Sequence, residues 1–249
     1  MGRRGRIGWT VGLVLLAVLV VGAVVADRIA RTRAAEAVAA EVQREAGLPS
    51  APEVVFPGGS FLWQAARGSF DFITVTAAEA EREGITGRDV SVRLEDVQVE
   101  RDVLLGRGGA ISAAGGSARA LVPYSSLEER VERDWRKVAI SQAGSEVEVT
   151  GEFTVLGREQ SLSVVLAVEL DGSTLVLTPT AASVPGRELD LDALRRVADR
   201  FGIESPLDGV PVELRGLPPE VRPRTVTVTQ QGLRVGADLQ AMQVAVPPR

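Results

Sequence analysis

Residues 146–177 read EVEVTGEFTVLGREQSLSVVLAVELDGSTLVL, and this stretch decides the fold class. Every second residue from Val147 to Val155 is apolar or glycine, with Glu or Thr between, and the alternation resumes from Leu162 to Leu170. A period of two is typical of a strand with one buried and one exposed face. Asp171-Gly172 then predicts a tight hairpin turn. We therefore expect an antiparallel sheet here.

The same alternation appears on both sides of this stretch. Residues 90–99 form an interrupted strand, in which Glu95-Asp96 breaks the apolar period, and residues 225–235 form a second hairpin around Gln231-Gly232. Helical patterns cover three segments, residues 27–47, 125–137 and 191–201, the last preceded by Asp190 as N-cap. The glycine-rich residues 106–116 predict a mobile loop. The expected fold class is α+β, with one long curved antiparallel sheet packed on two or three helices.

An uncharged run precedes the first of these helices. Residues 7–26, IGWTVGLVLLAVLVVGAVVA, number 20 and would span roughly 30 Å as a helix, which is the thickness of the hydrocarbon core of a bilayer. This predicts a single-pass protein with a cytoplasmic tail (1–6), a transmembrane anchor (7–26) and an extracytoplasmic domain (27–249) at the cell membrane. Val24 and Ala26 also fit a signal-peptide cleavage site, which would give a secreted protein.

Composition excludes several function classes. The chain has no cysteine and no histidine, so thiolate chemistry, zinc-thiolate sites and Ser-His or Cys-His nucleophiles are unavailable. Its net charge of −5 argues against a nucleic-acid partner, which would need clustered positive charge. Asp190-Leu191-Asp192 matches the D-x-D pattern of metal-dependent glycosyltransferases, although acidic residues here also cap a helix. We expect a protein that is not an enzyme and has no metal or cofactor.

Aromatic residues gather in one short segment. Five of them lie within residues 56–72, and such a cluster either fills a core or contacts lipid. Its members are Phe56, Phe61, Trp63, Phe70 and Phe72.

Several motifs, in their order and spacing, resemble the LmeA-like phospholipid-binding family of actinobacteria. They are Glu45 to Pro49, Phe61-Leu62-Trp63-Gln64 with Gly68-Ser69-Phe70, Val92 to Val97, Pro123-Tyr124 with Leu127, and Thr225 to Val228 with Gly232-Leu233. The resemblance implies an envelope protein that binds phospholipids, phosphoinositide-type ones among them, and supports lipoglycan assembly. It also implies a half-domain of the tubular lipid-binding, bactericidal/permeability-increasing type, in which a curved sheet wraps a helix around a lipid groove.

These considerations give a leading function and named candidate residues. The function is non-enzymatic phospholipid binding, with transfer as an extension, through an apolar groove that needs no catalytic residue. The alternatives are an envelope scaffold without lipid and the metal-dependent glycosyltransferase. Arg67 and Arg119 are candidate headgroup partners because they flank apolar stretches. The residues expected to line the groove are Phe61, Leu62, Trp63, Phe70, Val149, Phe153, Leu166 and Leu177.

Overall fold

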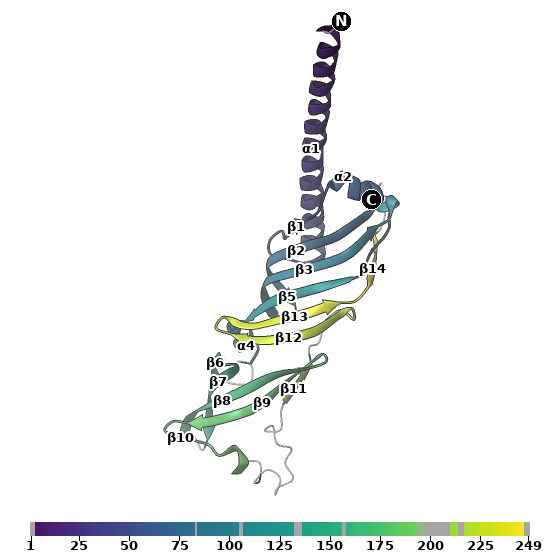
Figure 1. The fold of residues 1–249 in the computed structure, drawn as a ribbon. Helices are drawn as coiled ribbons and strands as arrows, with labels where there is room; N and C mark the ends of the chain where they lie inside the picture. Colours follow the sequence, from purple (N-terminus) through teal and green to yellow (C-terminus); the bar gives the residue numbers. More distant parts are fainter. Residues whose placement is uncertain are drawn as a thin grey trace.

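The computed structural model describes residues 3–82, 84–104, 107–131, 136–155, 158–193, 196, 210–213 and 217–246. Figure 1 shows an elongated molecule in which a long helix leads into one sheet and a second sheet lies at the far end. Among the residues that the structure describes, no helix is both long and apolar enough to cross a membrane.

The first sheet has eight antiparallel strands and draws on both ends of the chain. The order is β1-β2-β3-β5-β13-β12, and β4 pairs with both β3 and β14. The C-terminal hairpin therefore lies beside strands formed about a hundred residues earlier. The strands are β1 (Glu53–Val55), β2 (Ser69–Arg82), β3 (Ile85–Val99), β4 (Gly109–Ala113), β5 (Gly115–Pro123), β12 (Val221–Thr229), β13 (Gly232–Leu239) and β14 (Met242–Val246).

The second sheet has six strands and contains the stretch quoted first. Its order is β10-β9-β8-β7-β6, with β11 also paired to β9. The hairpin around Asp171-Gly172 is confirmed, because Asp171 pairs with Thr174 across it. The strands are β6 (Arg136–Ala143), β7 (Glu146–Val155), β8 (Arg158–Asp171), β9 (Thr174–Val184), β10 (Arg187–Glu188) and β11 (Val210–Glu213).

Within the described residues, four helices accompany the sheets, besides the helical residues 191–193. They are α1 (Arg3–Ala46), α2 (Phe61–Arg67), α3 (Arg101–Leu104) and α4 (Tyr124–Val131). The α+β class with antiparallel sheets and few helices is confirmed, but the single long sheet is wrong. The chain leaves the first sheet at Pro123, turns through α4 and starts a separate sheet at Arg136. The helix expected over 125–137 is correspondingly shorter. Of the one expected over 191–201, residues 191–193 are helical, and most of the remainder lies outside the described residues.

Most of the described part of the glycine-rich segment is strand rather than loop, contrary to our expectation. Most of residues 109–116 belong to β4 and β5. A Cβ atom at Gly116 would lie 2.0 Å from the carbonyl oxygen of Arg93, so glycine is needed here to let β5 approach β3.

The core of the first sheet lies against α1 and α2. The rings of Phe56, Phe61 and Phe70 pack with centroids 5.3 to 5.8 Å apart, and Val97 beside them is 0% exposed. From α1, Ala39 is buried in this cluster, and Ala30, Ala34 and Ala35 pack against it. These alanines lie on one side of the helix, and their small side chains let it lie close to the sheet. On β3, Leu94 and Val97 both face this core because Asp96 between them adopts a left-handed conformation, with φ 49°.

Candidate functional site

One face of the second sheet is apolar along three neighbouring strands. Val149 of β7 lies opposite Val164 of β8, and Val168 of β8 lies opposite Leu177 of β9. Residues directly opposite in an antiparallel pair share a face. Leu166 lies on the same face, because it pairs with Val147 of β7 on one side and with Pro179 of β9 on the other. The alternation read from the sequence therefore becomes a continuous apolar face.

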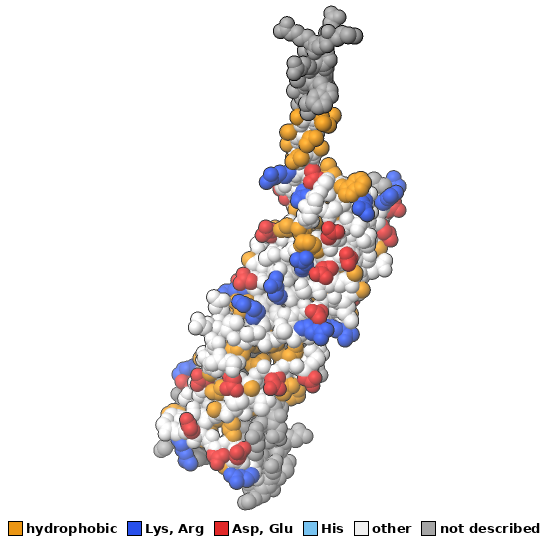
Figure 2. Space-filling model, viewed as in Figure 1, with side chains coloured by type: hydrophobic (Ala, Val, Ile, Leu, Met, Phe, Trp, Pro, Cys, Tyr) orange, Lys and Arg blue, Asp and Glu red, His pale blue; other side chains and the backbone are white. Residues whose placement is uncertain are grey.

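This face continues onto the first sheet through a shared cluster. Tyr124 of α4, Val147 of β7 and Leu233 of β13 are buried together. Figure 2 shows hydrophobic side chains at the surface where the two sheets meet. We call this continuous surface the joined apolar face. Half-buried side chains from both sheets pack against the cluster: Val122, Leu127, Ile140, Val149, Val168, Val226 and Val228.

Tyr124 lies at the junction between the sheets. Its hydroxyl donates a hydrogen bond to the carbonyl oxygen of Thr229 at 2.7 Å, which ties α4 to the end of β12. Burial raises the pKa of the Tyr124 hydroxyl, so the group stays protonated and remains a donor at neutral pH. A second hydrogen bond, from the backbone amide of Ile140 in β6 to the Glu128 carboxylate, ties α4 to the second sheet.

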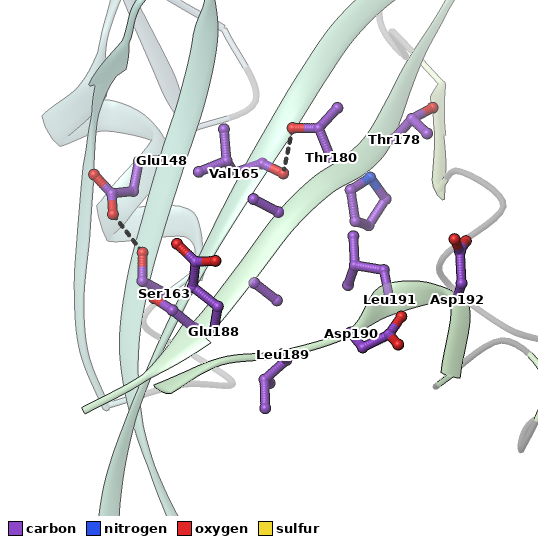
Figure 3. Close-up of a pocket in the computed structure, with 14 residues that line it drawn as sticks. Glu148, Ser163, Val165, Thr178, Thr180, Glu188, Leu189, Asp190, Leu191 and Asp192 are labelled. Atoms are coloured by element: carbon purple, nitrogen blue, oxygen red, sulfur yellow. Dashed lines mark hydrogen bonds between the residues drawn. The ribbon is translucent and has the colours of Figure 1, made fainter. Parts of the chain in front are cut away.

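A pocket of about 770 Å³ opens on the other side of the second sheet (Figure 3). Glu148, Ser163 and Val165 line it, and they alternate along their strands with residues of the joined apolar face. Ser163 donates a hydrogen bond to Glu148. Glu188, Asp190 and Asp192 also line this pocket. Its four carboxylates would repel a phosphate. Its wall is mixed, because apolar side chains such as Val165, Leu189 and Leu191 alternate with these charged groups.

The D-x-D pair lies at the rim of this pocket. The Asp190 carboxylate accepts a hydrogen bond of 3.0 Å from the backbone amide of Ala193, which confirms its expected N-cap role. Within the described part of the chain, no group of three His, Cys, Asp or Glu residues could hold a metal ion.

The aromatic segment divides into a buried and an exposed part. Phe61 and Phe70, expected to line a groove, are 8% and 3% exposed in the core. Leu62 and Trp63 on the opposite side of α2 are 44% and 64% exposed. The Arg67 guanidinium lies 5.8 Å from the centre of the Trp63 ring.

Hydrogen bonds hold α2 against α1. Asp27 accepts from the Ser60 hydroxyl at 2.6 Å and from the Leu62 amide at 2.8 Å, and Ser60 caps α2 by accepting from the Trp63 amide at 3.2 Å. These hydrogen bonds, led by the one from Ser60, lower the pKa of the Asp27 carboxyl, with the Arg31 charge as a smaller cause. Arg31 also donates to the carbonyl oxygen of Gly59.

The expected site residues thus fall into separate places. Val149, Leu166 and Leu177 lie together on the joined apolar face. Phe153 is in β7 at a position of the same parity as Val149, but its side chain lies outside the described residues. Arg119 sits on the opposite face of its sheet, because it alternates with Ala118, which pairs with Val92 and Ala237. It lines a second pocket, of about 220 Å³, with Asp89 and Arg234.

Sequence reasoning missed the contribution of the first sheet to this face. Val226, Val228 and Leu233 had been recognised only as hairpin residues, because their partners in the second sheet lie far away in the sequence. It also missed α2 as a helix, although its ends carry signals: Ser60 at the N-cap and Gly68, with φ 68°, at the C-cap.

Comparison with known proteins decides the family. A family model described as LmeA-like phospholipid-binding matches residues 25–238. The chain belongs to this family. Neither the comparison with curated proteins nor that with solved structures found a match. The LmeA-like assignment confirms the resemblance seen in the sequence motifs, and it indicates lipid binding, which is a non-enzymatic kind of function.

Proposed function

We propose that this protein holds the acyl chains of a phospholipid on the joined apolar face. The observation that carries the proposal is that apolar rows from two sheets meet in one surface whose side chains are mostly half-buried rather than fully buried. Half-buried valine and leucine side chains can gain further burial when an acyl chain covers them.

The size of the ligand requires such a surface. Two acyl chains of about 30 methylenes would lose on the order of 20 kcal/mol on leaving a bilayer, at roughly 0.8 kcal/mol each. A protein offsets this cost only with an extended apolar surface. In the acidic pocket on the other face of the second sheet, the carboxylates of Glu148, Glu188, Asp190 and Asp192 interrupt the apolar lining. Holding a lipid in this way requires no catalytic group, which agrees with a chain that has no histidine or cysteine.

We further propose that residues 7–26 anchor the protein in the cell membrane and leave residues 27–249 outside the cytoplasm. The 20 uncharged residues support this placement, and exposed apolar side chains from Leu16 to Val25 on α1 would be unfavourable in water. An anchored lipid-binding domain could pass phospholipid to envelope lipid or lipoglycan assembly. A phosphoinositide-type lipid is the proposed cargo.

The test is organic extraction and mass spectrometry of purified residues 27–249. This cut keeps Asp27 and the alanines of α1 that complete the core. We expect stoichiometric phospholipid. An empty domain that also takes no lipid from vesicles would overturn the proposal in favour of an envelope scaffold.

Cross-linking then locates the lipid. A phospholipid with a photoreactive group in its acyl chain should label β7, β8 and β9 at residues such as Leu166 and Leu177. Labelling confined to the acidic pocket, for example at Thr178 or Leu189, would contradict the proposed face. The glycosyltransferase alternative is tested by D190N/D192N, which keeps a capping side chain at position 190 and should leave lipid content unchanged.

A further inference from the structure

A second apolar surface lies at the opposite end of the molecule from the second sheet. On α2, Leu62 and Trp63 are exposed, and Arg67 lies over the Trp63 ring. We call these three residues the α2 patch. The buried side of the same helix, Phe61 and Gln64, completes the core. The exposed pair therefore contributes nothing to the core, although exposing a tryptophan and a leucine side by side is unfavourable in water.

The α2 patch continues an exposed apolar surface on α1. Figure 2 shows hydrophobic side chains on the stem of α1 and on the adjoining end of the body. The described part of the chain has 14 exposed large apolar side chains, and nine of them lie on α2 or on α1 between Leu16 and Ile29. They are Leu16, Leu19, Val20, Val21, Val24, Val25, Ile29, Leu62 and Trp63.

Hydrogen bonds fix the height of the α2 patch along α1. The amide of Leu62 donates to Asp27 at 2.8 Å, and Asp27 directly follows the uncharged run. Val20 and Val24 are seven and three positions before Asp27, so they lie on the same side of α1 as the residue that holds α2. The patch is therefore fixed where the uncharged run ends.

The residue types suit a boundary between hydrocarbon and water. Tryptophan favours this layer because its ring is apolar and its N–H is polar, and arginine extends its charged end toward lipid phosphates. Arg28 and Arg67 are both exposed at this level, and either can meet an anionic headgroup.

We propose that the α2 patch inserts into the headgroup layer of the bilayer that holds residues 7–26. This inference rests on the proposed anchor. The patch would give the domain a second attachment beside α1 and so limit how far it tilts or rotates about the anchor. The joined apolar face would then keep a defined orientation to the membrane from which lipid is taken.

The absence of cysteine allows the proposal to be tested with single-cysteine variants of the full chain. Each variant carries an environment-sensitive fluorophore and is placed in vesicles of phosphatidylcholine and phosphatidylglycerol. L62C is compared with S173C, which lies at the exposed turn of the β8–β9 hairpin in the second sheet. L13C, within the uncharged run, reports on the anchor.

We expect lipid-borne nitroxide to quench the fluorophore at position 62 several-fold more than at position 173, and W63D in the L62C background to abolish the difference. The contrary result is that aqueous iodide quenches the probe at position 62 as strongly as the probe at position 173, while lipid-borne nitroxide still quenches the probe of L13C. That outcome overturns the patch and leaves the anchor standing. If L13C is also unquenched, the anchor fails, and the patch fails with it. Lipid extraction from residues 27–249 tests cargo binding separately.

Discussion

The two sheets of this protein use the same alternating sequence pattern but finish their apolar faces differently. In the first sheet, α1 and α2 cover the face, and Phe70 and Val97 are 3% and 0% exposed. In the second sheet, Val149, Val164, Leu166 and Leu177 are only half-buried within the part of the chain that the structure describes. In the described part of the chain, the first face is thus a core at these residues, whereas the second keeps half-buried apolar area, which is where we propose that the lipid binds.

The largest expected effect tests the core side of this comparison. F70A should lower the free energy of unfolding by about 3 to 5 kcal/mol, because it removes a buried ring from the cluster with Phe56 and Phe61. L177A should cost about 1 to 2 kcal/mol, since Leu177 buries less of its surface. Denaturant unfolding of the lipid-free protein measures both. Equal losses would show that the two faces do not differ as described.

The next effect tests the ligand side. L177D places a charge on the joined apolar face and should weaken phospholipid binding by about 10- to 100-fold, or roughly 1.4 to 2.8 kcal/mol. V176D is the matched control, because Val176 is the neighbouring half-buried residue on the opposite face of β9. Binding is measured by lipid uptake from vesicles. If both variants lose binding alike, the loss reflects general damage to the sheet rather than to the lipid face.

A smaller effect concerns the joint between the two sheets. Y124F keeps the buried ring and removes the 2.7 Å hydrogen bond to Thr229, so we expect a loss of about 1 kcal/mol in the free energy of unfolding. Thermal unfolding of Y124F beside S125A, an exposed change in the same helix, measures it. An unchanged melting temperature in Y124F would mean that packing alone holds the joint.

Local patterns in the sequence predicted the antiparallel hairpins. They could not predict how the strands divide between two sheets, because that depends on partners far apart in the sequence. The alternation from Val147 to Leu170 and the turn at Asp171-Gly172 are short-range signals, so they gave the strands of the second sheet. The position of β13 beside β5 depends on pairs such as Leu233 and Val122, which no local signal specifies. This is why two sheets were expected to be one.

The site shows the same limit. Val149, Leu166 and Leu177 were placed on a common face because strand parity fixes which way a side chain points. Phe61 and Trp63 were treated alike because both are aromatic, yet two positions apart on a helix they point in different directions. Recognising Ser60 and Gly68 as caps would have separated them.

The smallest effect concerns the attachment of α2 to α1, the two helices that cover the first sheet. The pKa of Asp27 is lowered below its ordinary value of 3.8 in the folded protein, mainly by the hydrogen bond from Ser60. A lowered pKa means that the carboxylate stabilises the fold fully above the unfolded-state pKa and loses this contribution as the pH falls through the folded-state value. In the full chain in detergent, D27A should therefore melt below the wild type at pH 6, and the gap should narrow below about pH 4. E36A changes an exposed carboxylate on the same helix and serves as control. If the difference in melting temperature between D27A and the wild type widened as the pH fell, the pKa of Asp27 would not be lowered in the folded protein. Asp27 would then not hold α2 through its charged form.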